Sequence, residues 1–347
     1  MDATTARGLV TLAEDARDLR RRQDPAAERV LEERYPELGQ ALDWFAEAGR
    51  PDDAGRLATA LVTFWIATKR LADADAWFDR ALRDPRASEL TRARALYDHG
   101  YVVFWAGRYD LAEQRFRDSL ALARQLGQPS LQALALAGLG RVVINTDPSD
   151  AVRLLREAMS VTAGLDDADE GRSSAMHVLG VALQLVGDFT AAREVMSTRL
   201  EVGRSRGDDL VVWAEASNLS MVERQLGNLD RAEQLSREAL ALGARRRDDM
   251  AIAWLLNGLA AVTAAKARVA DEGWERAATL NGLAASLLER AGGEWPADER
   301  AQYEETLVAL RAALSPEVMD RARERGATMT TDEGVAYAML PDATVRG

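Results

Sequence analysis

Several residue types that build catalytic and metal sites are scarce or missing in this chain of 347 residues. The chain has no cysteine, which excludes disulfides, cysteine-ligated zinc and a thiol nucleophile, and agrees with a cytoplasmic location. It has two histidines, so a metal site built from three histidines cannot form within one chain. We therefore expect neither a metal nor a cofactor.

The chain also has fewer basic than acidic residues. The formal net charge is −12 and the isoelectric point is about 4.9, which disfavours binding to DNA phosphates or anionic lipid. The N-terminal segment 1–22 lacks the apolar core of a signal peptide, and no uncharged stretch is long enough for a membrane helix. We expect a cytoplasmic protein that contacts neither nucleic acid nor membrane directly.

Short turn-like segments recur along the chain at a constant spacing. Each has a small or polar residue followed two positions later by an aromatic or aliphatic one, and the segments begin at positions 107, 147, 187, 227 and 267. Lys69 begins a similar segment, slightly less than one such step before Gly107. A constant period of about 40 residues indicates a repeat protein in which each repeat is one supersecondary unit.

Each turn-like segment is flanked by two helical patterns. After the segment, residues of one helix face recur at i, i+4 and i+8 and begin with an alanine, as in Ala112, Phe116 and Leu120. Before it, the helical pattern carries a glycine at 100, 140 and 180, although glycine in a helix costs about 1 kcal/mol relative to alanine. We infer helical hairpins whose two helices approach too closely for a larger side chain, and such hairpins must stack to bury their apolar faces.

The ends of the chain depart from the period and are predicted to form caps. Residues 24–25 (Asp-Pro) start a helix that we expect to continue to Gly49. Pro296 and the pair 315–316 (Ser-Pro) start two further helices, and residues 330–333 form a capping box for a last short helix. The predicted division is an N-terminal helical cap (1–50), a repeat array of about six hairpins (51–291) and a C-terminal helical cap (292–347).

The hairpin pattern resembles the tetratricopeptide repeat, or TPR. The positions that carry this resemblance are Leu96, Gly100, Gly107, Tyr109, Ala112 and Phe116. The tryptophan that begins the usual motif is missing, and the period exceeds the usual length of about 34 residues, so the extra residues lie in the turns between hairpins. The resemblance implies an all-α fold, a right-handed superhelix of TPR-like hairpins.

Other segments resemble the C-terminal helical region of large actinobacterial regulators, the STAND-type ATPases that often carry a LuxR-type DNA-binding domain. These segments are residues 35–44, 64–65, 77–82 and 326–337. The family implies a sensor arm that binds an inducer or a partner, relieves autoinhibition of an ATPase and so acts in transcriptional regulation. This chain has no Gly-x-x-x-x-Gly-Lys phosphate loop and no separate basic helix-turn-helix, so ATP hydrolysis and DNA binding are not carried over. The chain is either the sensor region of a longer protein or a free-standing relative.

The first helix of a TPR-like hairpin lines the inner groove of the superhelix. The constant step of the repeat places aromatic, arginine, methionine, amide and histidine side chains at these inner positions. They are Tyr97, Tyr101, Phe104, Trp105, Arg141, Asn145, His177, Gln184, Met221, Arg224, Trp254 and Asn257. Such side chains are typical of ligand and peptide grooves. The alternative is that the aromatic residues belong to the core between hairpins and the polar residues are simply hydrated.

Three function classes follow from these features. The first is a non-catalytic sensor module that binds a small molecule or a short peptide in the concave groove. The second is a protein–protein interaction scaffold that uses the same groove for a partner protein. The third is an enzyme built in the groove, which is disfavoured because the chain lacks His-Glu-x-x-His, Gly-x-Ser-x-Gly and calcium-loop motifs.

Overall fold

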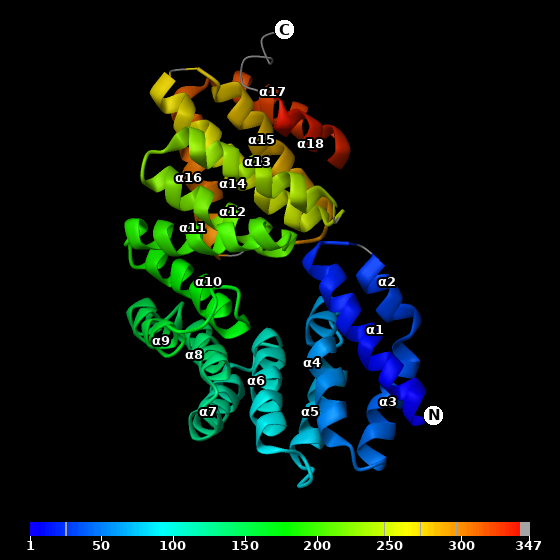
Figure 1. Cartoon of the computed structure of the whole chain (residues 1–347). Coiled ribbons are helices and arrows are strands. Elements are labelled where there is room, and N and C mark those ends of the chain that lie inside the picture. Colours follow the sequence, from blue (N-terminus) through cyan, green and yellow to red (C-terminus); the bar gives the residue numbers. More distant parts are fainter. Residues whose placement is uncertain (25, 246, 271, 296, 341–347) are drawn as a thin grey trace. The chain divides into compact units, whose positions relative to one another are not determined.

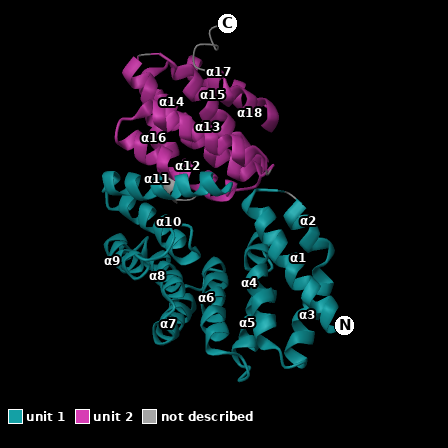
Figure 2. Ribbon diagram, viewed as in Figure 1, with its two compact units in different colours: residues 1–207 teal, residues 208–347 magenta. Residues whose placement is uncertain are grey.

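The computed structural model of the chain describes residues 1–24, 26–245, 247–270, 272–295 and 297–340. All the regular elements in these ranges are α-helices, which confirms the all-α prediction (Figure 1). The helices group into two compact units, residues 1–207 and 208–347 (Figure 2). The division into two caps and an array remains a prediction; the boundary between the compact units falls inside the predicted array.

Six consecutive hairpins occupy the predicted array. Unit 1 contains four of them, namely α4 (Pro51–Ala67) with α5 (Leu71–Leu82), α6 (Glu89–Trp105) with α7 (Tyr109–Gln125), α8 (Pro129–Val143) with α9 (Pro148–Val161), and α10 (Glu170–Leu185) with α11 (Phe189–Arg206). Unit 2 contains the other two, α12 (Asp209–Gln225) with α13 (Leu229–Arg245) and α14 (Asp249–Ala270) with α15 (Trp274–Arg290).

The predicted turn-like segments form the tight turns inside the hairpins. Gly107, Gly187 and Gly227 adopt φ angles of +75°, +82° and +81°, a left-handed conformation that glycine reaches without a steric penalty. Lys69 adopts the same conformation with φ +57°, as its place nearly one period before Gly107 predicted. The segment at 147 differs, because Asp147 instead caps α9 by accepting a hydrogen bond from the backbone N–H of Asp150.

The turn predicted at 267 is wrong. Helix α14 continues through this position to Ala270, and the left-handed turn residue is Gly273, with φ +95°. Ala267 and Arg268 are strong helix formers and no glycine lies between Gly258 and Gly273, so nothing in this stretch ends the helix. The last hairpin is therefore longer than the period predicts.

Small residues set the spacing of the two helices in each hairpin. The alanines that begin the buried face of each second helix are fully buried; they are Ala74, Ala112, Ala151, Ala192, Ala232 and Ala277. A Cβ atom placed on Gly100 would lie 2.8 Å from the ring of Phe116, four residues after Ala112. One repeat later, a Cβ on Gly140 would lie 3.2 Å from Leu155. Close helix packing thus excludes a side chain at Gly100 unless Phe116 moves, and at Gly140 a Cβ would require Leu155 to shift by a few tenths of an ångström.

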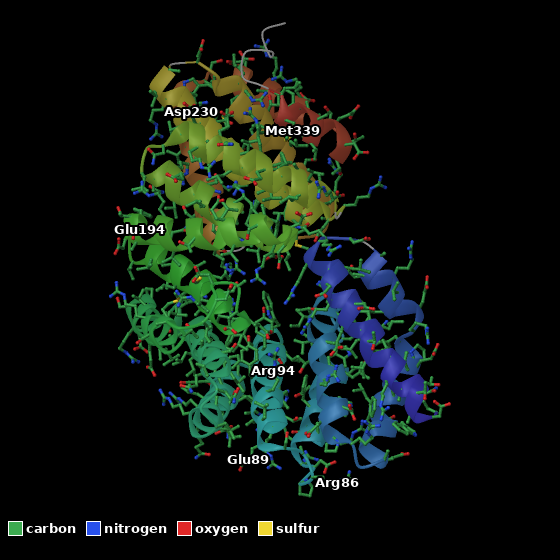
Figure 3. The ribbon with its side chains drawn as sticks, viewed as in Figure 1. Arg86, Glu89, Arg94, Glu194, Asp230 and Met339 are labelled. Carbon is green, nitrogen blue, oxygen red and sulfur yellow. The ribbon has the colours of Figure 1, made fainter. Side chains whose placement is uncertain are left out.

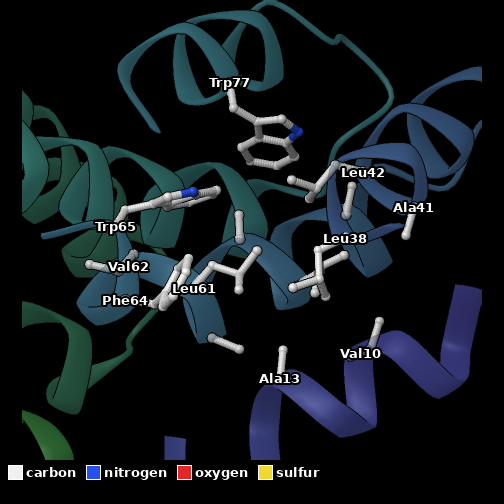
Figure 4. Packing of buried hydrophobic residues seen from close by; sticks show 14 of the residues in the cluster. Val10, Ala13, Leu38, Ala41, Leu42, Leu61, Val62, Phe64, Trp65 and Trp77 are labelled. Atoms are coloured by element: carbon white, nitrogen blue, oxygen red, sulfur yellow. The ribbon is translucent and has the colours of Figure 1, made fainter. Parts of the chain in front are cut away.

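The N-terminal segment forms three helices, α1 (Ala3–Arg21), α2 (Ala26–Glu33) and α3 (Tyr35–Glu47). The prediction of one helix up to Gly49 is wrong, because the chain breaks at Arg34 and starts α3 with Pro36 in its first turn. Proline lacks the N–H that a continuous helix would need there, and its ring clashes with the preceding turn. Pro25 lies outside the described residues. Side chains of α1, α3, α4 and α5 share one apolar core (Figure 4).

The C-terminal segment adds α16 (Ala297–Ala313), α17 (Pro316–Ala327) and α18 (Thr331–Met339). Ser315 caps α17, and the predicted capping box of Thr330 and Glu333 is present at α18. Pro296 lies outside the described residues. Helix α17 packs on α15 at backbone distance, since a Cβ on Gly326 would lie 2.0 Å from the carbonyl oxygen of Thr279.

Among the described helices, α14 is long and apolar enough to cross a membrane by length and composition alone. However, 72% of its most apolar stretch is buried inside the structure. Helices α12, α13, α15 and α16 all pack against it. This burial is typical of the central core helix of a soluble protein.

We predict that Ala112→Leu or Ala192→Leu lowers the free energy of unfolding by about 1–3 kcal/mol, because the larger side chain overpacks the contact between the two helices of its hairpin. Arg245→Ala is the control, since the Arg245 side chain is 60% exposed and its ion pair with Asp209 is a surface pair. It should change stability by less than about 0.5 kcal/mol in urea unfolding. Equal losses of unfolding free energy in the alanine variants and in Arg245→Ala would show that Ala112 and Ala192 do not lie where the two helices meet.

Candidate ligand-binding surface

The first helices of the hairpins in unit 1 form one side of the stack. Helix α4 packs on α6, α6 on α8 and α8 on α10, whereas α5, α7 and α9 pack mainly on the first helices of their own and the following hairpins. The first helices are therefore closer together than the second helices, and the stack curves with the first helices on its inner side. Helix α1 packs on α4, at the start of this row.

An arginine ties two of these helices together across the inner side. Arg94 lies on α6 (Figure 3). Its guanidinium donates to Glu170 at the start of α10, with distances of 2.8 and 2.9 Å, and its Nε donates to Asp98 at 3.0 Å. Asp98 is 1% exposed and also accepts a hydrogen bond of 2.6 Å from the hydroxyl of Thr59 on α4. The cluster thus joins α4, α6 and α10, which belong to three different hairpins.

The protonation of the two acids reflects their surroundings. Burial raises the pKa of Asp98, against the opposing effect of the positive charge on Arg94. Burial also acts to raise the pKa of Glu170, but hydrogen bonds from Arg94 and the charges of Arg94, Arg17 and Arg21 lower it to about 2. Because Arg17 and Arg21 lie on α1, this helix also faces the inner side near α10.

Aromatic side chains of α6 continue from this cluster towards the end of the helix. The rings of Tyr97 and Tyr101 stack with centroids 6.3 Å apart, and Tyr101 meets Trp105 edge-on at 6.2 Å. Phe104 contacts both Trp105 and Tyr109, at 5.8 and 5.5 Å. Exposure rises along the row, from 8% for Tyr97 to 53% for Trp105. Half-exposed aromatic residues are common anchors in recognition surfaces.

Arg141 of α8 completes this surface. Its guanidinium carbon lies 5.7 Å from the centre of the Tyr101 ring, and its Nη2 atom lies 3.5 Å from the hydroxyl of Ser174 on α10. Among the described residues, no carboxylate lies within 4.0 Å of this guanidinium. We call the group of Tyr97, Tyr101, Phe104, Trp105 and Arg141 the inner aromatic surface.

The structure brings five of the predicted site residues together in the inner aromatic surface. His177 lies on α10, one turn after Ser174, and is half-buried, as is Gln184 near the end of that helix. Asn145 is exposed in the turn between α8 and α9, outside the first helix in which the sequence placed it.

The predicted site residues of unit 2 lie beneath the chain's own helix α16. Asn257 is fully buried, and its amide donates to the carbonyl and the carboxylate of Glu299 at 3.0 and 2.7 Å. Met221 and Trp254 line a small pocket together with Glu299 and Gln302 of α16. Arg224 of α12 lies 3.6 Å from the carboxylate of Glu305, which is also on α16.

Sequence reasoning missed the polar part of the surface in unit 1. Arg94 and Asp98 occupy i and i+4 on the same helix as Tyr97, so their spacing was a usable signal for an ion pair. Glu170 gave no such signal, because an acid in the first turn of a helix is ordinarily explained by the helix dipole. Arg17 lies outside the period altogether.

Comparisons with known proteins bear on the fold and on the resemblance. Residues 91–163 and 216–246 match family models described as tetratricopeptide repeat. Both stretches are tetratricopeptide repeats. The chain is also similar in fold to a Rap protein complexed with Competence and Sporulation Factor, with a TM-score of 0.52, 13% identity and coverage of 93% of this chain and 100% of that one. At this identity the similarity shows the TPR-like fold alone.

Curated relatives confirm the resemblance to bacterial regulators. A protein named as an HTH-type transcriptional regulator of Mycobacterium tuberculosis is 28% identical over 214 residues, which are 59% of this chain and 24% of the relative. The regulatory protein AfsR of Streptomyces griseus is 29% identical over 226 residues, which are 56% of this chain and 23% of the relative. The chain thus spans about a quarter of the length of these relatives.

We predict that Glu170→Gln lowers stability at neutral pH and that this difference shrinks as the pH falls. The folded-state pKa of Glu170 is about 2, below its ordinary value of 4.5, so its contribution is present above about pH 4.5 and is lost between there and pH 2. Its side chain is 47% exposed, so water screens the ion pair and the loss at pH 6.5 is at most about 1 kcal/mol. Urea unfolding at pH 6.5 and pH 3 measures this.

The matched control is Glu194→Gln, since Glu194 is an exposed glutamate of the same unit (Figure 3). It should leave stability unchanged at both pH values. A stability difference between Glu170→Gln and the wild type that stays constant or grows on acidification would contradict the lowered pKa of Glu170.

We also predict that Asn257→Ala loosens α16 from α14. The substitution removes the hydrogen bonds that the buried Asn257 amide donates to the carbonyl and the carboxylate of Glu299, and a hydrogen bond to a charged group typically contributes about 1.5–3 kcal/mol. Hydrogen exchange followed by mass spectrometry should show faster exchange in residues 297–313. Residues 316–327 are the internal control, because α17 is held on α15 by backbone packing. Unchanged exchange in α16 would show that these hydrogen bonds do not hold it.

Proposed function

We propose that this chain is a non-catalytic recognition module that binds a short peptide or a small molecule on the inner aromatic surface of unit 1. The observation that carries the proposal is a row of aromatic rings that becomes progressively exposed beside Arg141, which has no acid partner among the described residues. Aromatic and arginine side chains supply a large share of binding energy in recognition surfaces. A Rap protein of similar fold, solved with Competence and Sporulation Factor, supports the choice of ligand class.

We further propose that binding is regulatory and takes place in the cytoplasm. The relatives are named as regulators, and the chain covers about a quarter of their length, so it corresponds to one part of such a protein. In a repeat protein each hairpin contacts mainly its neighbours, and stability is nearly a sum of local terms. A ligand that contacts α6, α8 and α10 at once would join three hairpins and stiffen the stack.

A protein–protein scaffold is the second candidate. It is favoured by the exposure of Trp105 and Tyr109, at 53% and 55%, around the turn between α6 and α7. Exposed aromatic residues at the edge of a repeat suit the surface of a folded partner. If this function is correct, Tyr109→Ala should weaken binding as strongly as Tyr101→Ala does.

The test is a comparison of Tyr101→Ala with Trp254→Ala, using a ligand identified by native mass spectrometry of the protein from its own organism. Tyr101 lies in the inner aromatic surface, so its loss should weaken ligand binding by at least about 2 kcal/mol, or about thirty-fold, in titration calorimetry. Trp254 lies beneath α16, so its loss should lower stability by about 3 kcal/mol and leave the affinity unchanged. A lowered melting temperature with intact affinity for Tyr101→Ala would contradict the proposed function.

A further inference from the structure

The charges on the inner side of unit 1 are unevenly matched. Asp98 and Glu170 on this side are both engaged by the single guanidinium of Arg94. Arg141 has no carboxylate within 4.0 Å among the described residues. Arg17 also forms no ion pair within the described part of the chain, and its Nε atom is buried without a hydrogen-bond partner there. On a chain with a net charge of −12, this leaves a local surplus of positive charge.

The hydroxyl groups around Arg141 have protons that they donate to no acceptor within the described part of the chain. The hydroxyl groups of Tyr97 and Tyr101 have no hydrogen-bond partner within the described part of the chain. The Ser174 hydroxyl lies 3.5 Å from Arg141, at the limit of a hydrogen bond. A group that accepts several hydrogen bonds and carries negative charge therefore fits this position, whereas a cation would be repelled.

Arg141 is also held in place before any ligand binds. Its guanidinium lies over the ring of Tyr101, a contact that attracts a cation to the negative face of an aromatic ring. A planar guanidinium presents paired N–H groups that match the two oxygens of a carboxylate or the oxygens of a phosphate. Lysine offers a point charge without this pairing, so Arg141→Lys is not a conservative change here.

From these observations we infer that the ligand presents a carboxylate or phosphate group to Arg141 and lays an apolar group against Trp105. This inference rests on the proposed function and names the chemical class of its ligand. Tyr101, over which Arg141 lies, and Trp105 are separated by about 6 Å of helix at about 1.5 Å per residue. An extended peptide of about two residues covers this length, at roughly 3.3–3.6 Å per residue. The acidic and the apolar group should then lie one or two residues apart.

The experiment is a selection from a display library of random seven-residue peptides on the immobilised full chain. Enriched peptides should carry Asp or Glu one or two positions from a large apolar residue. A selected peptide should bind Arg141→Gln at least tenfold more weakly by fluorescence anisotropy, and Arg141→Lys should restore only part of the loss. The Arg141→Gln variant should melt as the wild type does, because no ion pair within the described chain is lost.

The matched control is Arg153→Gln on α9, an arginine whose side chain is 64% exposed and pairs with Asp150. It should bind the selected peptide with unchanged affinity. Replacing the acidic residue of the peptide by phosphoserine distinguishes the two sources of the anionic group: tighter binding assigns a phosphate and weaker binding assigns a carboxylate.

Two outcomes would overturn the inference, and they are distinguishable. Enrichment of peptides without an acidic residue, whose binding depends on Tyr101 but not on Arg141, would refute the anionic ligand and leave the proposed function intact. If no enriched peptide depends on Tyr101, the proposed function itself fails, and the inference fails with it.

Discussion

The distance at which the two helices of a hairpin pack is the constraint on which the rest of the structure depends. Ala112 is fully buried where α6 meets α7, and Gly100 leaves no room for a Cβ beside the ring of Phe116. With the two helices this close, one hairpin exposes a broad apolar face that the next hairpin must cover. Stacking follows from this, and so does the row of first helices on which the inner aromatic surface lies.

The ion cluster around Arg94 modifies this nearest-neighbour architecture. Repeat proteins are held together mainly by contacts between adjacent hairpins, but Arg94 joins α6 to α10 and leaves α8 between them. Because Glu170 is half exposed, the link is screened and modest in energy, and it restrains the spacing of the hairpins more than it stabilises them. It also engages Asp98 and Glu170, whereas Arg141 has no carboxylate within 4.0 Å among the residues that the structure describes.

The sequence predicted those features that repeat with the period and missed those that do not. The turns at Gly107, Gly187 and Gly227 and the buried alanines follow from local backbone and packing rules, so spacing alone found them. The turn at 267 was placed by the period, but the helix-forming residues there allow α14 to continue to Ala270. A local helical propensity overrode the repeat at this position.

The site was predicted in part for the same reason. Tyr101 and Arg141 occupy equivalent positions one repeat apart, so the period brought them to one surface. Arg94 and Glu170 are 76 residues apart and occupy different positions within their hairpins. The repeat period therefore does not relate them. The position of α16 over Asn257 depends on the chain folding back after the last hairpin, and the period ends before that segment.

The central claim is that the inner aromatic surface of unit 1 holds a ligand, and native mass spectrometry of the full chain purified from its own organism tests it most directly. The account predicts a mass above that of the chain, carried by an anionic peptide or small molecule. That extra mass should be absent from a Tyr101→Ala variant purified in the same way and should persist in Arg153→Gln. A wild-type chain that carries no extra mass, or an extra mass that is unaffected by Tyr101→Ala, would contradict the account.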